Sequence, residues 1–293
     1  MRLDLPTVLL QWATGGLLFL WVTTRRREVG LGYGWLLRSS YGVLALIGLI
    51  AGLAAHDHGA GATLRNFGNA GVVLGAGIAL AVSVVLRSAG VSGQRARRAA
   101  KAQRVAAMTQ LEPSAAGAAS ATAPGRTGAE FPPALDLLAP ALGLFGILGS
   151  ASVAGGPYGQ SALRLVIGAL FLGVISDAML LGHWYLVQPG LGREPLKELV
   201  RLVGWIWPFE VAALLWPIGM LQVLSGSISD GYHGLLGYTW VVCALTTIAL
   251  VGVTWLALRE RYYSAVMAAT GLLYLAILTA FGTDLVARAV LAS

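Results

Sequence analysis

Long apolar runs alternate with short polar segments along most of the chain. A helix needs about 20 apolar residues to cross the hydrocarbon core of a bilayer. Eight runs meet that length: 5–23, 35–55, 69–87, 134–154, 162–188, 198–223, 234–257 and 264–286. The pattern predicts an all-α integral membrane protein with about eight transmembrane helices. It divides the chain into a first membrane segment (1–87, three helices), a linker (88–132) and a second membrane segment (133–293, five helices).

The basic residues predict an orientation for these helices. All but four of the 20 Lys and Arg residues lie in the segments 24–38, 87–132, 189–201 and 258–263. Because positive charge favours the cytoplasmic side, these segments are expected to be cytoplasmic and both termini extracytoplasmic. The four exceptions are Arg2, Arg65, Arg164 and Arg288, which this topology places on the outer side. We expect a multi-pass protein of a bacterial-type cytoplasmic (inner) membrane.

Composition supports a lipid environment. Only 11% of the residues are charged and the mean hydropathy is +0.74, whereas soluble domains carry about 25% charged residues. The net charge of +7 would suggest nucleic acid in a soluble protein. Here the basic residues cluster beside apolar runs, so no nucleic-acid partner is expected. The single cysteine, Cys243, excludes an internal disulfide and a multi-cysteine metal site.

The linker 88–132 begins with a basic run, Arg95–Arg104, and continues as a tract rich in Ala, Ser, Gly and Pro. The tract has too little apolar bulk to fold, which predicts disorder. The basic run is expected to lie on anionic lipid or on the acidic surface of a partner.

Two carboxylic acids stand out inside the apolar runs. Asp177 and Glu210 lie near the middle of two consecutive predicted helices. If these helices pack antiparallel, the two carboxyl groups could face one another and pass a proton, hold a cation or bind a carbonyl group. Ionisable residues at this depth are functional candidates by default. The alternative is that each acid is neutral and bonds a neighbouring helix for structural reasons.

Aromatic and polar residues near these acids suggest a ligand pocket. His183, Trp184, Tyr185 and Trp207 are the candidates for binding a quinone, because such rings suit apolar pockets that contain a few hydrogen-bonding groups. Trp184 shares a helical face with Asp177, and His183 points elsewhere. Pro208 and Pro217 are expected to kink the helix that carries Glu210.

Three histidines are weak candidates for a metal site on the outer side: His56, His58 and His233. An H-x-H pair in a loop is only weak evidence for a metal site, and no metal ion is expected.

The chain has no P-loop, H-E-x-x-H or G-x-S-x-G motif. The leading hypothesis is a membrane subunit of an electron-transport complex, without a covalently bound cofactor, that binds quinone or conducts protons near Asp177 and Glu210. It would be a subunit of a membrane oxidoreductase rather than a stand-alone enzyme, with other membrane or redox subunits as partners. The alternatives are a proton- or cation-coupled solute transporter and a non-catalytic scaffold subunit.

Overall fold

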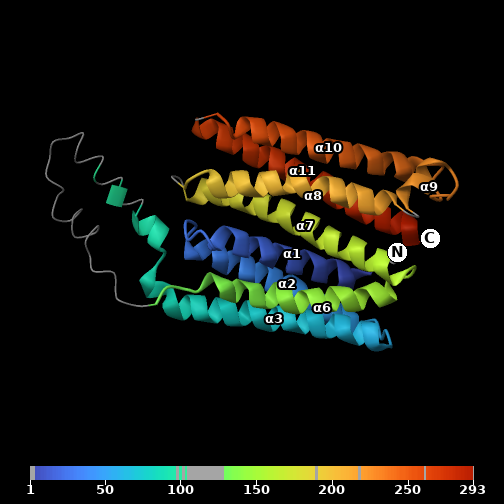
Figure 1. Ribbon diagram of the computed structural model, residues 1–293, viewed down its shortest axis with the longest axis horizontal. Coiled ribbons are helices and arrows are strands. Elements are labelled where there is room, and N and C mark those ends of the chain that lie inside the picture. Colours follow the sequence, from blue (N-terminus) through green and yellow to red (C-terminus); the bar gives the residue numbers. More distant parts are fainter. Residues whose placement is uncertain are drawn as a thin grey trace.

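The chain folds into a bundle of long α-helices (Figure 1). The computed structural model describes residues 4–96, 99–100, 103, 129–188, 191–216, 219–260 and 262–292. Its long helices are α1 (Leu5–Thr24), α2 (Leu31–Ala54), α3 (Ala60–Val85), α6 (Leu138–Val153), α7 (Tyr158–Val187), α8 (Glu194–Leu215), α10 (Leu235–Ala257) and α11 (Tyr263–Ala292). The short elements are η1 (Leu86–Ala89), η2 (Pro133–Leu137) and α9 (Met220–Leu224).

Seven of these helices are long and apolar enough to cross a membrane, counted over the described residues, which confirms an all-α membrane protein. The remaining long helix, α8, has 22 residues and carries Glu194, Lys197, Glu198 and Arg201 in its first two turns. It runs alongside the others in Figure 1 and packs against α7 and α10. Its polar start explains why the sequence of α8 is less clearly membrane-spanning than the other seven.

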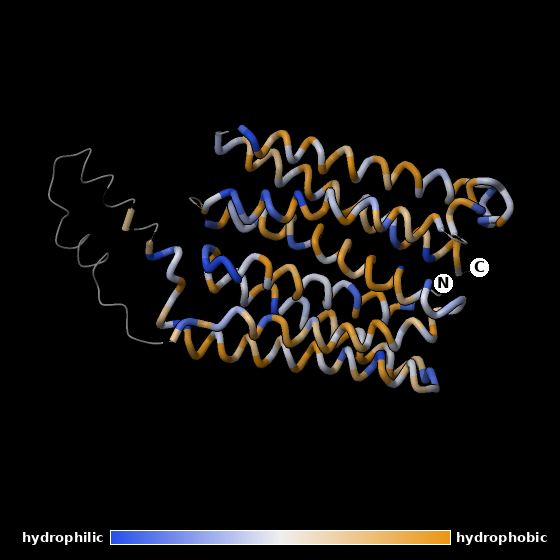
Figure 2. Tube along the Cα trace, in the orientation of Figure 1, coloured by the Kyte–Doolittle hydropathy of each residue, from blue (hydrophilic) through white to orange (hydrophobic). Residues whose placement is uncertain are grey.

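Hydrophobic side chains cover the outside of the bundle. Hydrophobic residues follow the lengths of the helices in Figure 2, and hydrophilic residues gather towards their ends. Phe67 and Leu278 are 69% and 70% exposed. A surface with so many large exposed apolar side chains would associate or aggregate in water, so these faces contact the lipid bilayer.

Both termini lie at the same end of the bundle, which we call the terminal end (Figure 1). The α2–α3 connection and α9 are also at the terminal end. The α1–α2 connection and the segments that follow α3 and precede α6 lie at the other end, called the opposite end.

The helices form two groups of four. In the first group α1 packs against α2, α2 against α3, α3 against α6, and α6 against α1. The second group repeats this cycle with α7, α8, α10 and α11. The groups meet mainly where α1 packs along α7. The close approach requires glycine: a Cβ on Gly173 would lie 2.2 Å from the backbone carbon of Gly15.

Three helices are longer than their apolar runs predicted. α3 begins at Ala60, α7 begins at Tyr158 and α11 continues to Ala292. Arg65, Arg164 and Arg288 therefore lie within helices and are buried, with exposed fractions of 1%, 6% and 0%. Arg164 already lay inside its predicted run, 162–188, whereas Arg65 and Arg288 lie beyond theirs. Acidic partners within the bundle allow α3 and α11 to include these two arginines.

The predicted helix 198–223 ends early. α8 stops at Leu215, and Trp216 takes an extended conformation with φ −125° and ψ 152°. The residue before a proline avoids the helical region, so Pro217 in the sequence accounts for the end. The predicted kink at Pro217 lies outside the described residues. Pro208 is accommodated inside α8.

Residues 97, 98, 101, 102 and 104 of the predicted basic run Arg95–Arg104 lie outside the described residues. Arg95 itself is described, and it forms an ion pair with Glu130, which precedes α6. Arg27 binds the same carboxylate at 2.9 Å. These ion pairs connect the two ends of the linker 88–132 to each other and to the α1–α2 connection.

Candidate functional site

Asp177 is buried in the interior of the bundle, where α7 meets α2. Its Oδ1 atom accepts a hydrogen bond from the hydroxyl of Tyr41 at 2.6 Å. The hydroxyl of Tyr33 donates to the backbone carbonyl of Asp177 at 3.4 Å. The Oδ2 atom has no hydrogen-bond partner among the described residues. Tyr33 and Tyr41 are also buried, so two phenol groups and one carboxyl group lie together away from water.

Glycine and serine residues make room for this arrangement. A Cβ on Gly16 would lie 2.0 Å from the ring of Tyr41, so only glycine lets the ring lie against α1. The hydroxyl of Ser176 donates to the carbonyl of Leu172 and accepts from the Nε1 group of Trp12 at 2.8 Å. The polar groups beside Asp177 therefore connect α7 to both α1 and α2.

Glu210 lies in a different part of the bundle and faces α11. Both of its carboxyl oxygens are buried, and no donor reaches either of them among the described residues. The Glu210 carboxyl lies close enough to the Asp284 carboxyl for the two groups to interact electrostatically. Two carboxyl groups can hydrogen-bond to each other only when one of them carries a proton. We infer that Glu210 and Asp284 form a carboxyl pair and that one proton is shared between them.

Arg288 identifies the charged member of this pair. It donates from Nε to Asp284 Oδ2 at 2.7 Å and from Nη2 to Oδ1 at 2.9 Å, one turn along α11. Such a two-point bond from a guanidinium group favours the ionised carboxylate. We therefore assign the proton to Glu210 and the negative charge to Asp284.

The surroundings of the carboxyl pair come from all the central helices. A Cβ on Gly168 would lie 3.1 Å from both Arg288 and Asp284, and 3.2 Å from Gln11. Gln11, on α1, donates from Nε2 to the carbonyl of Leu165 at 2.5 Å. Its Oε1 atom and the Nη1 atom of Arg288 are buried without a partner among the described residues.

Arg164 closes this cluster towards the terminal end. It interacts electrostatically with Glu210 and donates from Nε to the carbonyl of Ala213 at 2.8 Å. Pro217 has no N–H that could bond the Ala213 carbonyl. Arg164 donates to this carbonyl instead.

The structure does not bring Asp177 and Glu210 together. Glu210 lies at the level of Gly168, because Gly168 adjoins the Asp284 side chain that Glu210 faces. Asp177 is nine residues further along α7, about 14 Å along the helix axis at 1.5 Å per residue. The expected pair of carboxyl groups exists, but Asp284 replaces Asp177 as the partner of Glu210.

A third buried charged group lies towards the opposite end. Arg38 donates to Asp136 at 2.7 Å from Nε and at 2.9 Å from Nη2. The Thr24 hydroxyl donates to the same carboxylate at 2.9 Å. Arg38 precedes Tyr41 by three residues on α2, so it lies one turn from the phenol that binds Asp177.

The four candidates for quinone binding have separate neighbours. Exposed His183 bonds the hydroxyl of Tyr274 on α11 through Nδ1 at 2.9 Å. Trp184 packs near Tyr33, with ring centres 5.9 Å apart. Tyr185 donates to the carbonyl of Gly192.

Trp207, on α8, donates from Nε1 to the carbonyl of Ala244 on α10 at 3.0 Å. Trp184 does share the face of Asp177, as the helical spacing predicted. The four side chains nevertheless have separate hydrogen-bonding or packing partners.

The outer histidines are also dispersed. His56 and His58 lie in the α2–α3 connection and His233 lies between α9 and α10, at opposite edges of the terminal end (Figure 1). His56 Nδ1 is bonded to the carbonyl of Ala54 at 2.7 Å. Within the described part of the chain, no three His, Cys, Asp or Glu residues are arranged to hold a metal ion.

Sequence reasoning missed Asp284 and Arg288. They are spaced i, i+4 at the end of an apolar run, which is the spacing of an ion pair on one helical face. That spacing was the available signal. Tyr41 and Gln11 carried no such signal, because tyrosine and glutamine are unremarkable in membrane helices.

No family model matches the sequence, and neither the curated proteins nor the solved structures contain a significant match. The site geometry is therefore the basis for proposing a function.

Proposed function

We propose that this protein is a proton-conducting membrane subunit of an electron-transport complex. The observation that carries the proposal is the carboxyl pair of Glu210 and Asp284, which is buried in the bundle. Ionisable groups at such depth are expensive to insert and mark proton or ion pathways in membrane proteins.

Further titratable groups extend the proposed path along the bundle. From the opposite end, Arg38 and Asp136 are followed by Tyr41 and Asp177. The Ser176 hydroxyl adjoins Asp177 in the direction of the carboxyl pair. The remaining interval to Gln11 and Glu210 would be bridged by buried water, the usual partner of buried polar atoms that no protein group satisfies. The free atoms of Asp177, Gln11 and Glu210 would bind such water.

The proposal leaves quinone aside. His183, Trp184, Tyr185 and Trp207 have separate partners, so the proposal does not depend on a quinone site. Protons would move through the protein's own side chains and water, and the redox chemistry would belong to partner subunits.

The proposed topology has eight spans, with α8 as the eighth. Its 22 residues reach about 33 Å at 1.5 Å per residue, enough for the hydrocarbon core. An even number of spans agrees with two termini at one end. We propose that the terminal end is extracytoplasmic, in a bacterial-type inner membrane, because few Lys or Arg residues lie in its loops.

An impermeant maleimide should label Ser227→Cys in intact cells and Glu194→Cys only after lysis, in a Cys243→Ser background.

A proton-coupled transporter is the second candidate. The two groups of four helices have the same cycle of neighbours, and α1 and α7 both begin at the terminal end. Parallel structural repeats of this kind occur in transporters, whose sites lie between the repeats. Asp177 with Tyr41, and Gln11 with Leu165, both bridge the two groups.

Proton flux into proteoliposomes tests the proposal. The purified protein would be reconstituted around a trapped pH-sensitive dye, and a potassium gradient with valinomycin would impose a membrane potential. We expect potential-driven proton flux that Glu210→Gln lowers at least about tenfold, the effect of a barrier raised by about 1.4 kcal/mol. Glu194→Gln is the control, because Glu194 is 65% exposed and its carboxylate lies outside the path.

Equal flux in Glu210→Gln and in the native protein would refute proton conduction through the carboxyl pair. Flux that appears only when a solute is added would replace the first candidate with the transporter.

A further inference from the structure

A hollow opens at the terminal end between α2, α3 and the loop that joins them. Its volume is about 440 Å³, within the usual range of small-molecule sites. Its lining combines apolar and polar residues. The apolar residues include Leu49, Leu53 and Phe67, and the polar residues include His56, Asp57 and Asn66.

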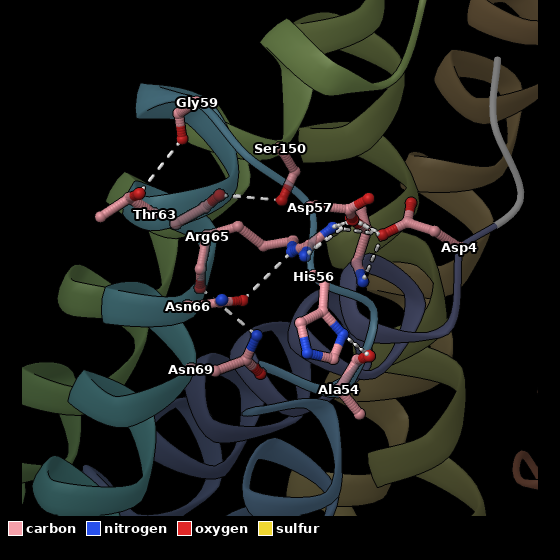
Figure 3. A network of polar contacts seen from close by, with 12 residues as sticks. Asp4, Ala54, His56, Asp57, Gly59, Thr63, Arg65, Asn66, Asn69 and Ser150 are labelled. Atoms are coloured by element: carbon pink, nitrogen blue, oxygen red, sulfur yellow. Dashed lines mark hydrogen bonds and ion pairs between the residues drawn. The ribbon is translucent and has the colours of Figure 1, made fainter. Parts of the chain in front are cut away.

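Buried Arg65 binds the polar lining of the hollow (Figure 3). It donates to Asp4 Oδ2 at 2.9 Å and to Asp57 Oδ2 at 3.2 Å. Asp4 also accepts bonds from the backbone and side chain of Thr7 at the start of α1. These contacts use Oδ2 of Asp57 and leave its Oδ1 atom available, on a side chain that is 39% exposed.

His56 presents a second acceptor. Its Nδ1 atom lies 2.7 Å from the carbonyl oxygen of Ala54 (Figure 3). A carbonyl oxygen can only accept, so Nδ1 carries the proton, and Nε2 of the neutral ring is an acceptor. The backbone of His56 has a positive φ of 52°, a conformation that few residues other than glycine adopt. The loop therefore holds the imidazole in place beside Asp57.

His56 and Asp57 both line the hollow, and acceptors on both side chains favour a ligand that donates several hydrogen bonds and carries positive charge. A primary ammonium group has three N–H donors. The apolar lining of the hollow continues onto the lipid-facing surface, where Leu53 is 62% exposed. The ligand must therefore join an ammonium group to a hydrocarbon chain at the level of the lipid headgroups.

We propose that this hollow binds a phospholipid with a primary ammonium headgroup, of the phosphatidylethanolamine class. Its ammonium group would bond Asp57 Oδ1 and His56 Nε2, and one acyl chain would lie against Leu53 and Phe67. Phosphatidylcholine has the same net charge and the same chains, but its trimethylammonium group has no N–H donor. The hollow should therefore distinguish these two lipids. The site is independent of the proposed proton path.

Native mass spectrometry of the full chain tests this proposal. The protein would be released from nanodiscs that contain equal amounts of phosphatidylethanolamine, phosphatidylcholine and phosphatidylglycerol with matched chains. We expect retained phosphatidylethanolamine to exceed phosphatidylcholine about tenfold, which corresponds to one hydrogen bond to a charged group. His56→Ala should lower this ratio, because it removes one of the two acceptors.

His233→Ala is the matched control. His233 is an exposed loop histidine at the same end of the bundle, and it also has a positive φ, 54°. The ratio should remain near tenfold in this variant. Equal retention of the two zwitterionic lipids by the native protein would overturn the proposal. A preference for phosphatidylglycerol, or an equal loss of selectivity in both histidine variants, would also overturn it.

Discussion

The carboxyl group of Glu210 on α8 faces the carboxyl group of Asp284 on α11, and Arg288 binds Asp284 from two nitrogen atoms. All three side chains are buried. This relationship connects α8 and α11, which lie diagonally across the second group of four helices. It also gives Asp284 and Arg288 a role in stability that is separate from any role in conduction.

Removing one member of the Asp284–Arg288 pair should destabilise the protein more than removing both members. Asp284→Asn leaves the Arg288 guanidinium buried without its counter-charge, which costs about 3–5 kcal/mol. The double variant Asp284→Leu, Arg288→Met removes both charges and should recover most of that loss. Unfolding of the detergent-solubilised variants measures both effects. Losses that simply add in the double variant would contradict the pairing.

Tyr41→Phe should impair Asp177 without altering the shape of its surroundings. The substitution removes the donor to Oδ1 and leaves both carboxyl oxygens without a donor, a cost of about 1–3 kcal/mol. Proton flux in proteoliposomes should fall as well, because the phenol adjoins the proposed path. Tyr238→Phe is the control, since Tyr238 is an exposed residue of α10. Unchanged stability and flux in Tyr41→Phe would count against both roles.

Gly173→Ala should weaken the contact between the two helix groups. The added Cβ would lie 2.2 Å from the backbone of Gly15, so α1 and α7 would have to separate. Overpacking of this kind costs about 1–3 kcal/mol. Gly77→Ala is a matched control within α3, where a Cβ meets nothing within 4 Å. There the better helix propensity of alanine should raise stability slightly. A tolerated Gly173→Ala would show that the groups pack less closely than described.

Asp230 should make stability depend on acid pH. The backbone N–H of Gly234, and then those of Tyr232, Leu236 and Gly237, bind its carboxylate and lower its pKa below the ordinary value of 3.8. A carboxyl group whose pKa is lowered in the folded protein stabilises the fold at pH values above its ordinary pKa. This contribution disappears as the pH falls through the lowered pKa. Asp230→Asn should be less stable at neutral pH, and the difference in melting temperature should shrink in acid. A difference in melting temperature that stays constant with pH would contradict this role of the Asp230 carboxylate.

The apolar runs predicted the class of protein because a lipid-facing helix must be apolar over its full length. They failed at the ends of helices, where buried ion pairs carry charge inside the bundle. Arg288 was placed in an outer segment because its charge ended the apolar run. Asp284, one turn before it, cancels that charge and allows α11 to continue.

The partner of Glu210 could not be deduced from depth alone. The midpoints of the apolar runs placed Asp177 and Glu210 at similar depths, but α7 is 30 residues long and extends beyond its run at the terminal end. Side chains on two neighbouring helices meet only if they lie at the same depth and if both helices are rotated so that the side chains face each other. The packing of α8 against α7 determines the depth and the rotation, and it depends on residues distributed over the whole bundle.

The central claim is that Glu210 carries a proton which it shares with Asp284 inside the bundle, and infrared spectroscopy tests it most directly. A protonated carboxyl has a C=O stretching band, distinct from the carboxylate bands, that shifts in heavy water. The account predicts such a band at neutral pH in the native protein and in Glu194→Gln, and a reduced band in Glu210→Gln. A spectrum in which Glu210→Gln leaves the protonated-carboxyl band unchanged would contradict the account.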